Sequence, residues 1–169
     1  SENKHVFNPT NFAIVFAFAF INNDYFILHP DQLSLNILPV VTTLVLGTIA
    51  CFRAQRLLIP VIYISLLFTV GLFISYMFSI SFYEIISPEL NAVGLIILFF
   101  MVTDPKTTPK EIPQQIGFAL LLFTISITLR LNQFLASQYV ALFLTCGILR
   151  YTSFFGGKDL GIASRRARS

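Results

Sequence analysis

The sequence predicts an all-α, polytopic helical membrane protein with about six membrane segments, some of them short and interrupted. Of its 169 residues, 56% are hydrophobic and only 11% are charged, whereas a soluble domain carries about 25% charged residues. The mean hydropathy is +0.79. Nineteen residues are Phe, a side chain with no polar group to satisfy in lipid. We expect one transmembrane domain over residues 1–151 and a basic cytoplasmic tail over 152–169.

The first element begins at Asn8 and Pro9. Asn8 is typical of a helix N-cap, and Pro9 suits the first helical position, where its missing N–H group has no consequence. The apolar run at 12–21 has only ten residues, whereas a bilayer core of ~30 Å requires roughly 20. Polar residues at 22–24 interrupt it before an apolar stretch resumes at 25–28. The element is therefore either a half-helix that enters a protein-lined cavity or a full span with a polar outer end.

Two full-length spans follow a turn at 29–31. The first, over 33–52, contains Pro39, which is tolerated because neighbouring helices can satisfy the freed carbonyl group. The second, over 57–79, is the longest apolar run and carries a proline in its first turn, where proline is well accommodated. Both runs have the length that a membrane crossing requires.

A short helix and a break occupy the middle of the chain. Residues 80–90 alternate apolar side chains with two glutamates and a proline, and this pattern favours a short interfacial segment outside the membrane. Residues 91–103 form an apolar run that is too short for a full crossing and stops at Asp104 and Pro105. The prolines that follow predict a loop or re-entrant turn over 106–115.

Two closing spans and a basic tail complete the chain. The spans are predicted over 116–129 and 138–149, with polar residues between them. We expect the tail, residues 150–169, to be disordered or to lie on anionic lipid headgroups, which attract Lys and Arg side chains. Its charge is small and it directly follows a membrane span, so nucleic acid is not an expected partner.

The distribution of Lys and Arg predicts the orientation. When residues 1–9, 53–56, 104–115 and the tail are placed on one side, that side holds ten of the eleven basic residues, and only Arg130 lies opposite. Short cytoplasmic loops carry such an excess of Lys and Arg. We therefore expect six membrane segments with both termini in the cytoplasm.

Asp104 is the best candidate for a functional side chain. Acids at membrane depth are energetically costly and are functional candidates by default. Asp104 follows Thr103 at the end of a short helix, and Pro105 prevents simple helical continuation. Together with the Asn8-Pro9 start it forms a pair of interrupted segments, a pattern that indicates a central binding site. The alternative is that Asp104 only caps the following turn at the cytoplasmic surface.

Other chemical motifs are weak. Cys51 and Cys146 lie in apolar runs, where free cysteine behaves as a small hydrophobic residue; the alternative is an iron–sulfur site shared with a second chain. His5 and His29 fall on opposite sides of the predicted membrane, so we expect no metal site. The sequence contains no catalytic triad, Walker loop or dinucleotide fingerprint, and we expect no catalytic residue.

Two short segments resemble a known family. Residues Lys4-His5-Val6-Phe7-Asn8-Pro9 are similar to the (N/K)-(N/H)-I-F-N-P-(A/S) segment of the RnfD/NqrB family, whose members belong to Rnf complexes and to the sodium-pumping NADH:quinone oxidoreductase. Residues Phe99-Phe100-Met101-Val102-Thr103-Asp104-Pro105 resemble that family's more specific F-F-(M/I)-(A/L)-T-D-P segment. The resemblance extends over residues 4–151 and corresponds to the later two-thirds of a typical member, so we expect a partial or reduced member.

The resemblance implies a component of a redox-driven ion pump in a bacterial-type inner membrane, with other membrane subunits as partners. Family members carry FMN attached through phosphate to a threonine of an S-(G/Q)-A-T motif, and often riboflavin. No Ser-x-Ala-Thr occurs in this sequence, which argues against covalent FMN. One hypothesis is therefore an electron-transfer component that holds non-covalent riboflavin or FMN, or docks redox partners, at a site lined by Asn8, Pro9, Thr103, Asp104 and Pro105. The other is a flavin-free membrane scaffold or small-solute conduit.

Overall fold

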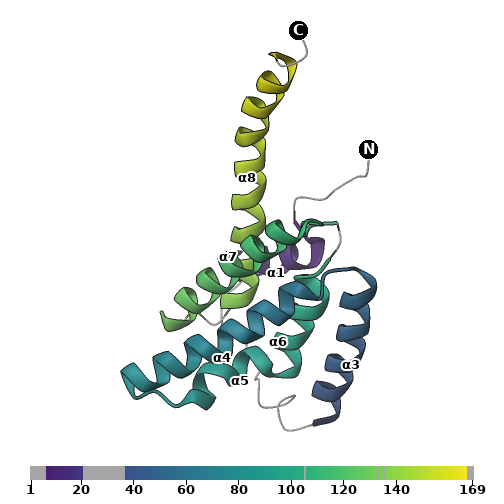
Figure 1. The fold of residues 1–169 in the computed structure, drawn as a ribbon. Helices are drawn as coiled ribbons and strands as arrows, with labels where there is room; N and C mark the ends of the chain where they lie inside the picture. Colours follow the sequence, from purple (N-terminus) through teal and green to yellow (C-terminus); the bar gives the residue numbers. More distant parts are fainter. Residues whose placement is uncertain (1–6, 21–36, 105, 133, 135, 167–169) are drawn as a thin grey trace.

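The computed structural model describes residues 7–20, 37–104, 106–132, 134 and 136–166. This part of the chain contains seven α-helices and one π-helical turn, and no strand, so the all-α prediction is confirmed. The expected interruption at 22–24 and the turn at 29–31 lie outside the described residues. All the helices except the end of α8 belong to one bundle, from which α8 projects with the C-terminal end of the chain (Figure 1).

The core of the bundle lies between three helices and the π-helical turn. Helices α4 (Leu58–Phe78), α7 (Ile112–Leu131) and α8 (Ser137–Arg166) surround η2 (Ile97–Met101). Their buried contacts include Leu67 from α4, Leu98 from η2, Phe118 from α7 and Leu142 from α8. Packing of this kind gives each helix a fixed position relative to η2, which leads directly into the Thr103-Asp104 segment.

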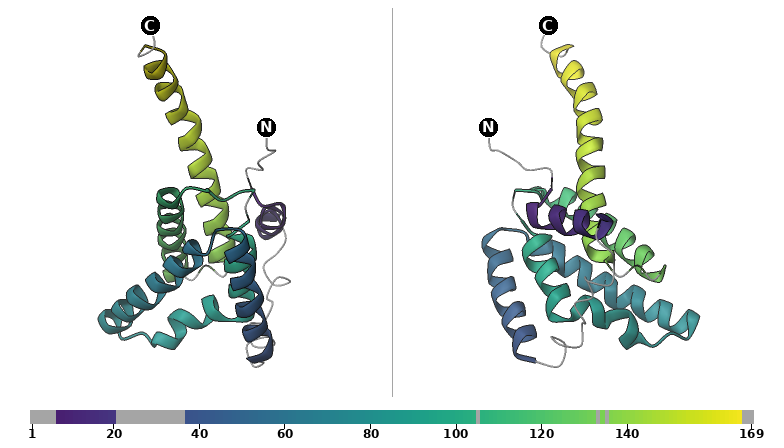
Figure 2. Two further views of the ribbon diagram at one scale, coloured as in Figure 1. Left: turned by 45° about the vertical axis from the view of Figure 1, so that its right-hand side comes forward. Right: turned by 180° about the vertical axis from the view of Figure 1, so that it is seen from behind.

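Helix α3 (Ile37–Arg53) packs against η2 and α6 (Ala92–Ile96) on another side. Cys51, Leu95 and Phe99 form this second core cluster. A Cβ atom at Gly47 would lie only 2.6 Å from the Phe99 Cβ atom, so glycine is what allows the two helices to approach this closely. Small residues at helix contacts are typical of membrane proteins. The two further views show α3 beside α6, with α1 (Pro9–Phe20) crossing near the base of α8 (Figure 2).

The burial pattern is that of a protein in lipid. Many large apolar side chains are exposed on the surface of the described helices, among them Ile37, Phe73 and Phe78. A soluble monomer rarely exposes apolar patches on this scale. Polar and charged side chains are instead buried inside: Asn11, Arg56, Glu89, Thr103, Thr108, Gln115, Ser126, Ser137 and Thr145.

By length and composition, two described helices, α4 and α7, can cross a membrane. A third crossing is added if α5 (Phe82–Leu90) and the Ala92–Met101 helix, bent by 53° at their junction, count as one broken span. The prediction of about six segments is therefore met only in part. The other described apolar helices are too short for a complete span, since α3 has 17 residues and α1 has 12.

Residues 80–90, predicted as a short interfacial segment, contain helix α5. This helix packs against α4 and buries Ile85 and Glu89. At the bend, Asn91 has an extended backbone, and its side chain accepts a hydrogen bond of 2.8 Å from the Gly94 N–H group. This cap starts α6 in a new direction.

The loop predicted over 106–115 is also shorter than expected. Helix α7 begins at Ile112, and Pro113 stands in its first turn, where proline is compatible with a helix. Pro113, which in the sequence indicated a loop, is therefore a helix-start signal. The tail was predicted to be disordered or to lie on lipid headgroups. In the structure its described backbone is helical, because α8 extends to Arg166.

The Asn91 cap yields a first prediction. Asn91→Ala will lower the free energy of unfolding of the full chain by about 1 kcal/mol, because the Gly94 N–H group loses its acceptor. Asn91→Asp keeps an acceptor oxygen and serves as the matched control. Chaotrope unfolding in detergent micelles, followed by circular dichroism, measures both variants, and equal losses in the two would contradict the capping role.

Candidate functional site

Asn8 joins the start of α1 to the break after η2. Its Oδ1 atom accepts hydrogen bonds from the backbone N–H groups of Thr10 (3.0 Å) and Asn11 (3.3 Å), which confirms the predicted N-cap. Its Nδ2 atom donates to Asp104 Oδ2 at 3.2 Å, across 96 residues of sequence. One amide side chain therefore caps a helix and holds the partner segment, and we call this contact the Asn8–Asp104 junction.

Asp104 uses its two carboxylate oxygens differently. Oδ2 accepts from Asn8, and Oδ1 accepts from the Lys106 backbone N–H group at 3.0 Å. Its carbonyl oxygen accepts from both the N–H (3.0 Å) and the hydroxyl (2.7 Å) of Thr108. The turn-capping alternative for Asp104 is thus present in the structure, together with a contact to α1 that a simple cap does not need.

Thr103 faces a different helix. Its hydroxyl donates to the Phe99 carbonyl oxygen, and the Cys51 thiol on α3 lies 3.3 Å from that oxygen and 3.4 Å from Thr103 Oγ1. The π-helical turn just before it is closed by the Val102 N–H donating to the Ile97 carbonyl at 2.9 Å. Such turns occur frequently at functional sites.

The structure thus brings only part of the predicted site together. Asn8 and Asp104 are in direct contact, and Pro9 is exposed at the first position of α1. Thr103 contacts α3 rather than α1. Pro105 lies outside the described residues. The two cysteines are both buried and free.

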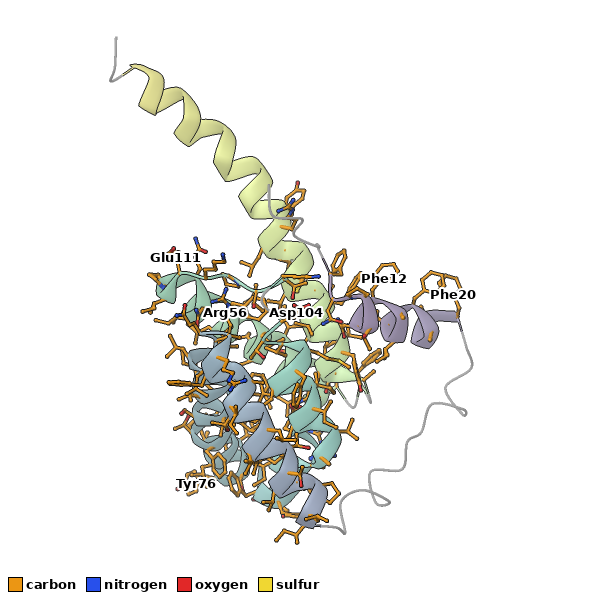
Figure 3. All side chains as sticks on the ribbon, turned by 90° about the vertical axis from the view of Figure 1, so that its right-hand side faces the viewer. Phe12, Phe20, Arg56, Tyr76, Asp104 and Glu111 are labelled. Carbon is orange, nitrogen blue, oxygen red and sulfur yellow. The ribbon has the colours of Figure 1, made fainter. Side chains whose placement is uncertain are left out.

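A second set of contacts fixes the loops at the same end of the bundle. The buried Arg56 side chain donates through Nε to Thr108 Oγ1 at 3.3 Å, and Gln115 Nε2 donates to the Gln55 carbonyl at 3.2 Å. Removal from water lowers the pKa of the Arg56 guanidinium. Figure 3 shows Arg56, Asp104 and Glu111 at one end and Tyr76 at the other. The segments 53–56 and 104–115, which the charge distribution placed on one side, lie together.

Asn11 adds an unused acceptor to the start of α1. It lies one helical turn after Asn8 and is 1% exposed, and its Oδ1 atom has no hydrogen-bond partner among the described residues. Next to it, α1 is anchored on α8 by stacking of the Phe7 and Phe143 rings, whose centroids are 4.5 Å apart. A buried carbonyl oxygen without a donor is costly, so this position favours binding a molecule that carries an N–H or O–H group.

The most deeply buried acid among the described residues, Glu89, is absent from the predicted site and is only 3% exposed. The Tyr63 hydroxyl donates to Glu89 Oε2 at 2.8 Å, and Gln138 Nε2 donates to the same oxygen. The Tyr63 oxygen also lies 3.1 Å from Ser126 Oγ. These four side chains, which come from α5, α4, α8 and α7, form what we call the Glu89 cluster. The signal that the sequence offered for this cluster is Glu89 itself, an acid five residues before Gly94 at the start of an apolar run.

Comparison of the chain with protein-family models, curated proteins and solved structures finds no match. The function must therefore be inferred from the residues and their geometry. Among the described residues, no group of three or more His, Cys, Asp or Glu side chains could hold a metal ion.

Proposed function

We propose that this chain is an integral-membrane component of a redox-driven, ion-translocating electron-transport complex, similar to the RnfD/NqrB proteins of Rnf complexes and the sodium-pumping NADH:quinone oxidoreductase. The observation that carries the proposal is the 3.2 Å contact between Asn8 and Asp104. These residues belong to the two short segments of the resemblance, and 96 residues separate them in sequence. A chance match of two unrelated segments would not require them to meet in the fold.

The residues at the Asn8–Asp104 junction fit the polar edge of a non-covalent flavin. The Asn11 Oδ1 atom is a buried acceptor without a donor among the described residues, and the isoalloxazine ring of riboflavin or FMN carries an N–H group that such an acceptor can bind. The Asp104 carboxylate, which contacts Asn8, provides further acceptor oxygens, and the Phe7 and Phe143 rings provide apolar surface. A flavin held there would supply electron transfer, while the side chains of this protein orient it.

The proposed topology places both termini in the cytoplasm of a bacterial-type inner membrane. Two hydrogen bonds support it, because Arg56 to Thr108 and Gln115 to Gln55 hold two Lys- and Arg-containing loops at one end of the bundle. That end would face the cytoplasm under the positive-inside rule.

Other membrane subunits are the proposed partners, together with anionic lipid at the basic tail. Helix α1 exposes a row of aromatic side chains, Phe12, Phe16 and Phe20, whose rings contact one another along the helix. Phe packs in lipid and in subunit contacts without leaving polar atoms unpaired.

Isolation of the native assembly tests the proposal. Flavin released from the purified complex is measured by its fluorescence, and the accompanying subunits are identified by mass spectrometry. We expect bound flavin and a large loss of electron transfer in Asp104→Asn, with no loss in Glu111→Gln, a matched exposed acid at the same end. Absence of flavin together with an unchanged Asp104→Asn phenotype would contradict the proposal.

The second candidate is a flavin-free scaffold or small-solute conduit within a larger assembly. The observation in its favour is that the sequence contains no Ser-x-Ala-Thr motif for covalent attachment. Under this alternative the Asn8–Asp104 contact only fixes α1 to the bundle. Asp104→Asn would then change the stability of the assembly without changing any electron-transfer rate.

A further inference from the structure

The Glu89 cluster places one carboxylate among hydrogen-bond donors inside an apolar bundle. Tyr63, Ser126 and Glu89 are all nearly inaccessible to water. The Tyr63 hydroxyl and the Gln138 amide both donate to Glu89 Oε2. Ionisable residues inside membrane segments are rare and mark proton relays and ion pathways. The Glu89 cluster is therefore a candidate for proton or ion binding.

The charges around Glu89 are few. Arg130, on α7, is the cation whose charge acts on the Glu89 carboxylate, and its Nη2 atom donates to the Glu84 carbonyl oxygen at 3.2 Å. From α4, the titratable neighbour is Tyr63, and α8 contributes the neutral Gln138. The ionised form of Glu89 is thus stabilised by two donors and one positive charge, whereas burial favours the neutral form of any carboxyl group.

A cavity of about 10 Å³ lies next to the two donors. It is lined by Tyr63, Ile97, Leu98, Val102, Leu122 and Gln138. This volume holds about one water molecule, and Tyr63 and Gln138 give that water polar partners. A proton that leaves Glu89 can therefore pass through the Tyr63 hydroxyl to a water in this cavity.

The chemistry of the cluster selects a proton over a metal cation. Sodium and similar hard cations require several oxygen ligands that point their lone pairs at the ion. Here the groups that point at Glu89 are an O–H and an N–H donor, and Arg130 adds a positive charge nearby. A proton binds the carboxylate without any new coordination space.

We propose that Glu89 is a reversible proton-binding site inside the bundle, which exchanges its proton through the cavity lined by Tyr63 and Gln138. In this exchange the Glu89 carboxylate gains a proton to become the neutral acid. On release that O–H bond breaks as the proton passes to the Tyr63 hydroxyl oxygen, while the Tyr63 O–H proton passes to a water in the cavity. This inference goes beyond the proposed function, because it holds whether or not a flavin is bound at the Asn8–Asp104 junction.

Dicyclohexylcarbodiimide, an apolar reagent that modifies protonated carboxyl groups in membranes, tests the proposal. Membrane vesicles that contain the full chain are treated over a range of pH, and the adduct is located by peptide mass spectrometry. We expect labelling of Glu89 that decreases as the pH rises, and none of Glu84, which lies on the surface of the same helix. Glu89→Gln should remove the adduct and, because Gln has nearly the same shape, leave the chain folded.

Tyr63→Phe is the second variant in the labelling experiment. Loss of a donor to the ionised carboxylate is expected to move the midpoint of labelling upward by about one pH unit, since a hydrogen bond to a charged group contributes about 1.5 kcal/mol or more. Tyr76→Phe, at an exposed position on the same helix, should leave the midpoint unchanged. Absence of Glu89 labelling at every pH at which the chain stays folded, or labelling that does not vary with pH, would overturn the proposal.

Discussion

Gly94→Ala is expected to lower the free energy of unfolding by about 3 kcal/mol, at the upper end of the range for overpacking a buried site. A Cβ atom at this position would lie 2.7 Å from the Pro88 carbonyl oxygen and still closer to that of Glu89. These oxygens belong to the backbone of α5, so no side-chain rotation can relieve the contact. The 53° bend between α5 and α6 would have to open, and Glu89 would move with it.

Gly117→Ala is the matched control for this substitution. Gly117 lies in α7, and a Cβ atom there would meet nothing within 4 Å. Alanine is favoured over glycine inside a helix by about 1 kcal/mol, so this variant should equal or exceed the wild type in stability. Chaotrope unfolding of both full-length variants in detergent is the measurement. A Gly94→Ala variant as stable as Gly117→Ala would show that the bend tolerates a side chain.

Tyr63→Phe is expected to lower the free energy of unfolding by about 2 kcal/mol. The substitution keeps the ring, which packs edge-on against Phe123 with centroids 5.6 Å apart, and removes only the hydroxyl. Glu89 then loses a 2.8 Å donor, and Ser126 loses its neighbour at 3.1 Å. Hydrogen bonds to charged groups contribute about 1.5–3 kcal/mol, and a buried group left without its partner is costly.

Tyr76→Phe controls for the loss of a tyrosine hydroxyl in general. Tyr76 is on the same helix and is 85% exposed, so its substitution should change stability by less than about 0.5 kcal/mol. The same unfolding measurement compares the two. Equal effects of Tyr63→Phe and Tyr76→Phe would mean that the Tyr63 hydroxyl does not stabilise Glu89.

Local signals in the sequence predicted a good part of the fold. The Asn8-Pro9 helix start follows from capping chemistry and is confirmed by the bonds to Thr10 and Asn11. The end of the short helix before Thr103 follows from the Asp-Pro pair, and η2 ends at Met101. Long apolar runs predicted α4 and α7. Each of these features depends on residues close together in the chain.

Features that depend on distant residues could not be predicted in the same way. Glu89 was placed outside the membrane because its own segment has mixed polarity, yet donors from α4 and α8 make its burial possible. Arg56 served only as a charge that marks the cytoplasmic side, whereas the structure buries it against Thr108. Among the described residues, apolar length also overestimated the number of membrane crossings, because the helix formed by the short run at 91–103 is too short to cross alone.

A double-mutant cycle between Asn8 and Asp104 tests most directly the central claim, that the two resembling segments form one functional site. The quantity measured is the electron-transfer turnover of the purified native complex with Asn8→Ala, Asp104→Ala or both. Residues that act as a unit show coupling of about 0.5–3 kcal/mol. We expect each single substitution to lower turnover by about tenfold, equivalent to about 1.4 kcal/mol, and the double substitution to be no worse than the more severe single one. Effects that simply multiply, or turnover that neither substitution changes, would contradict the claim.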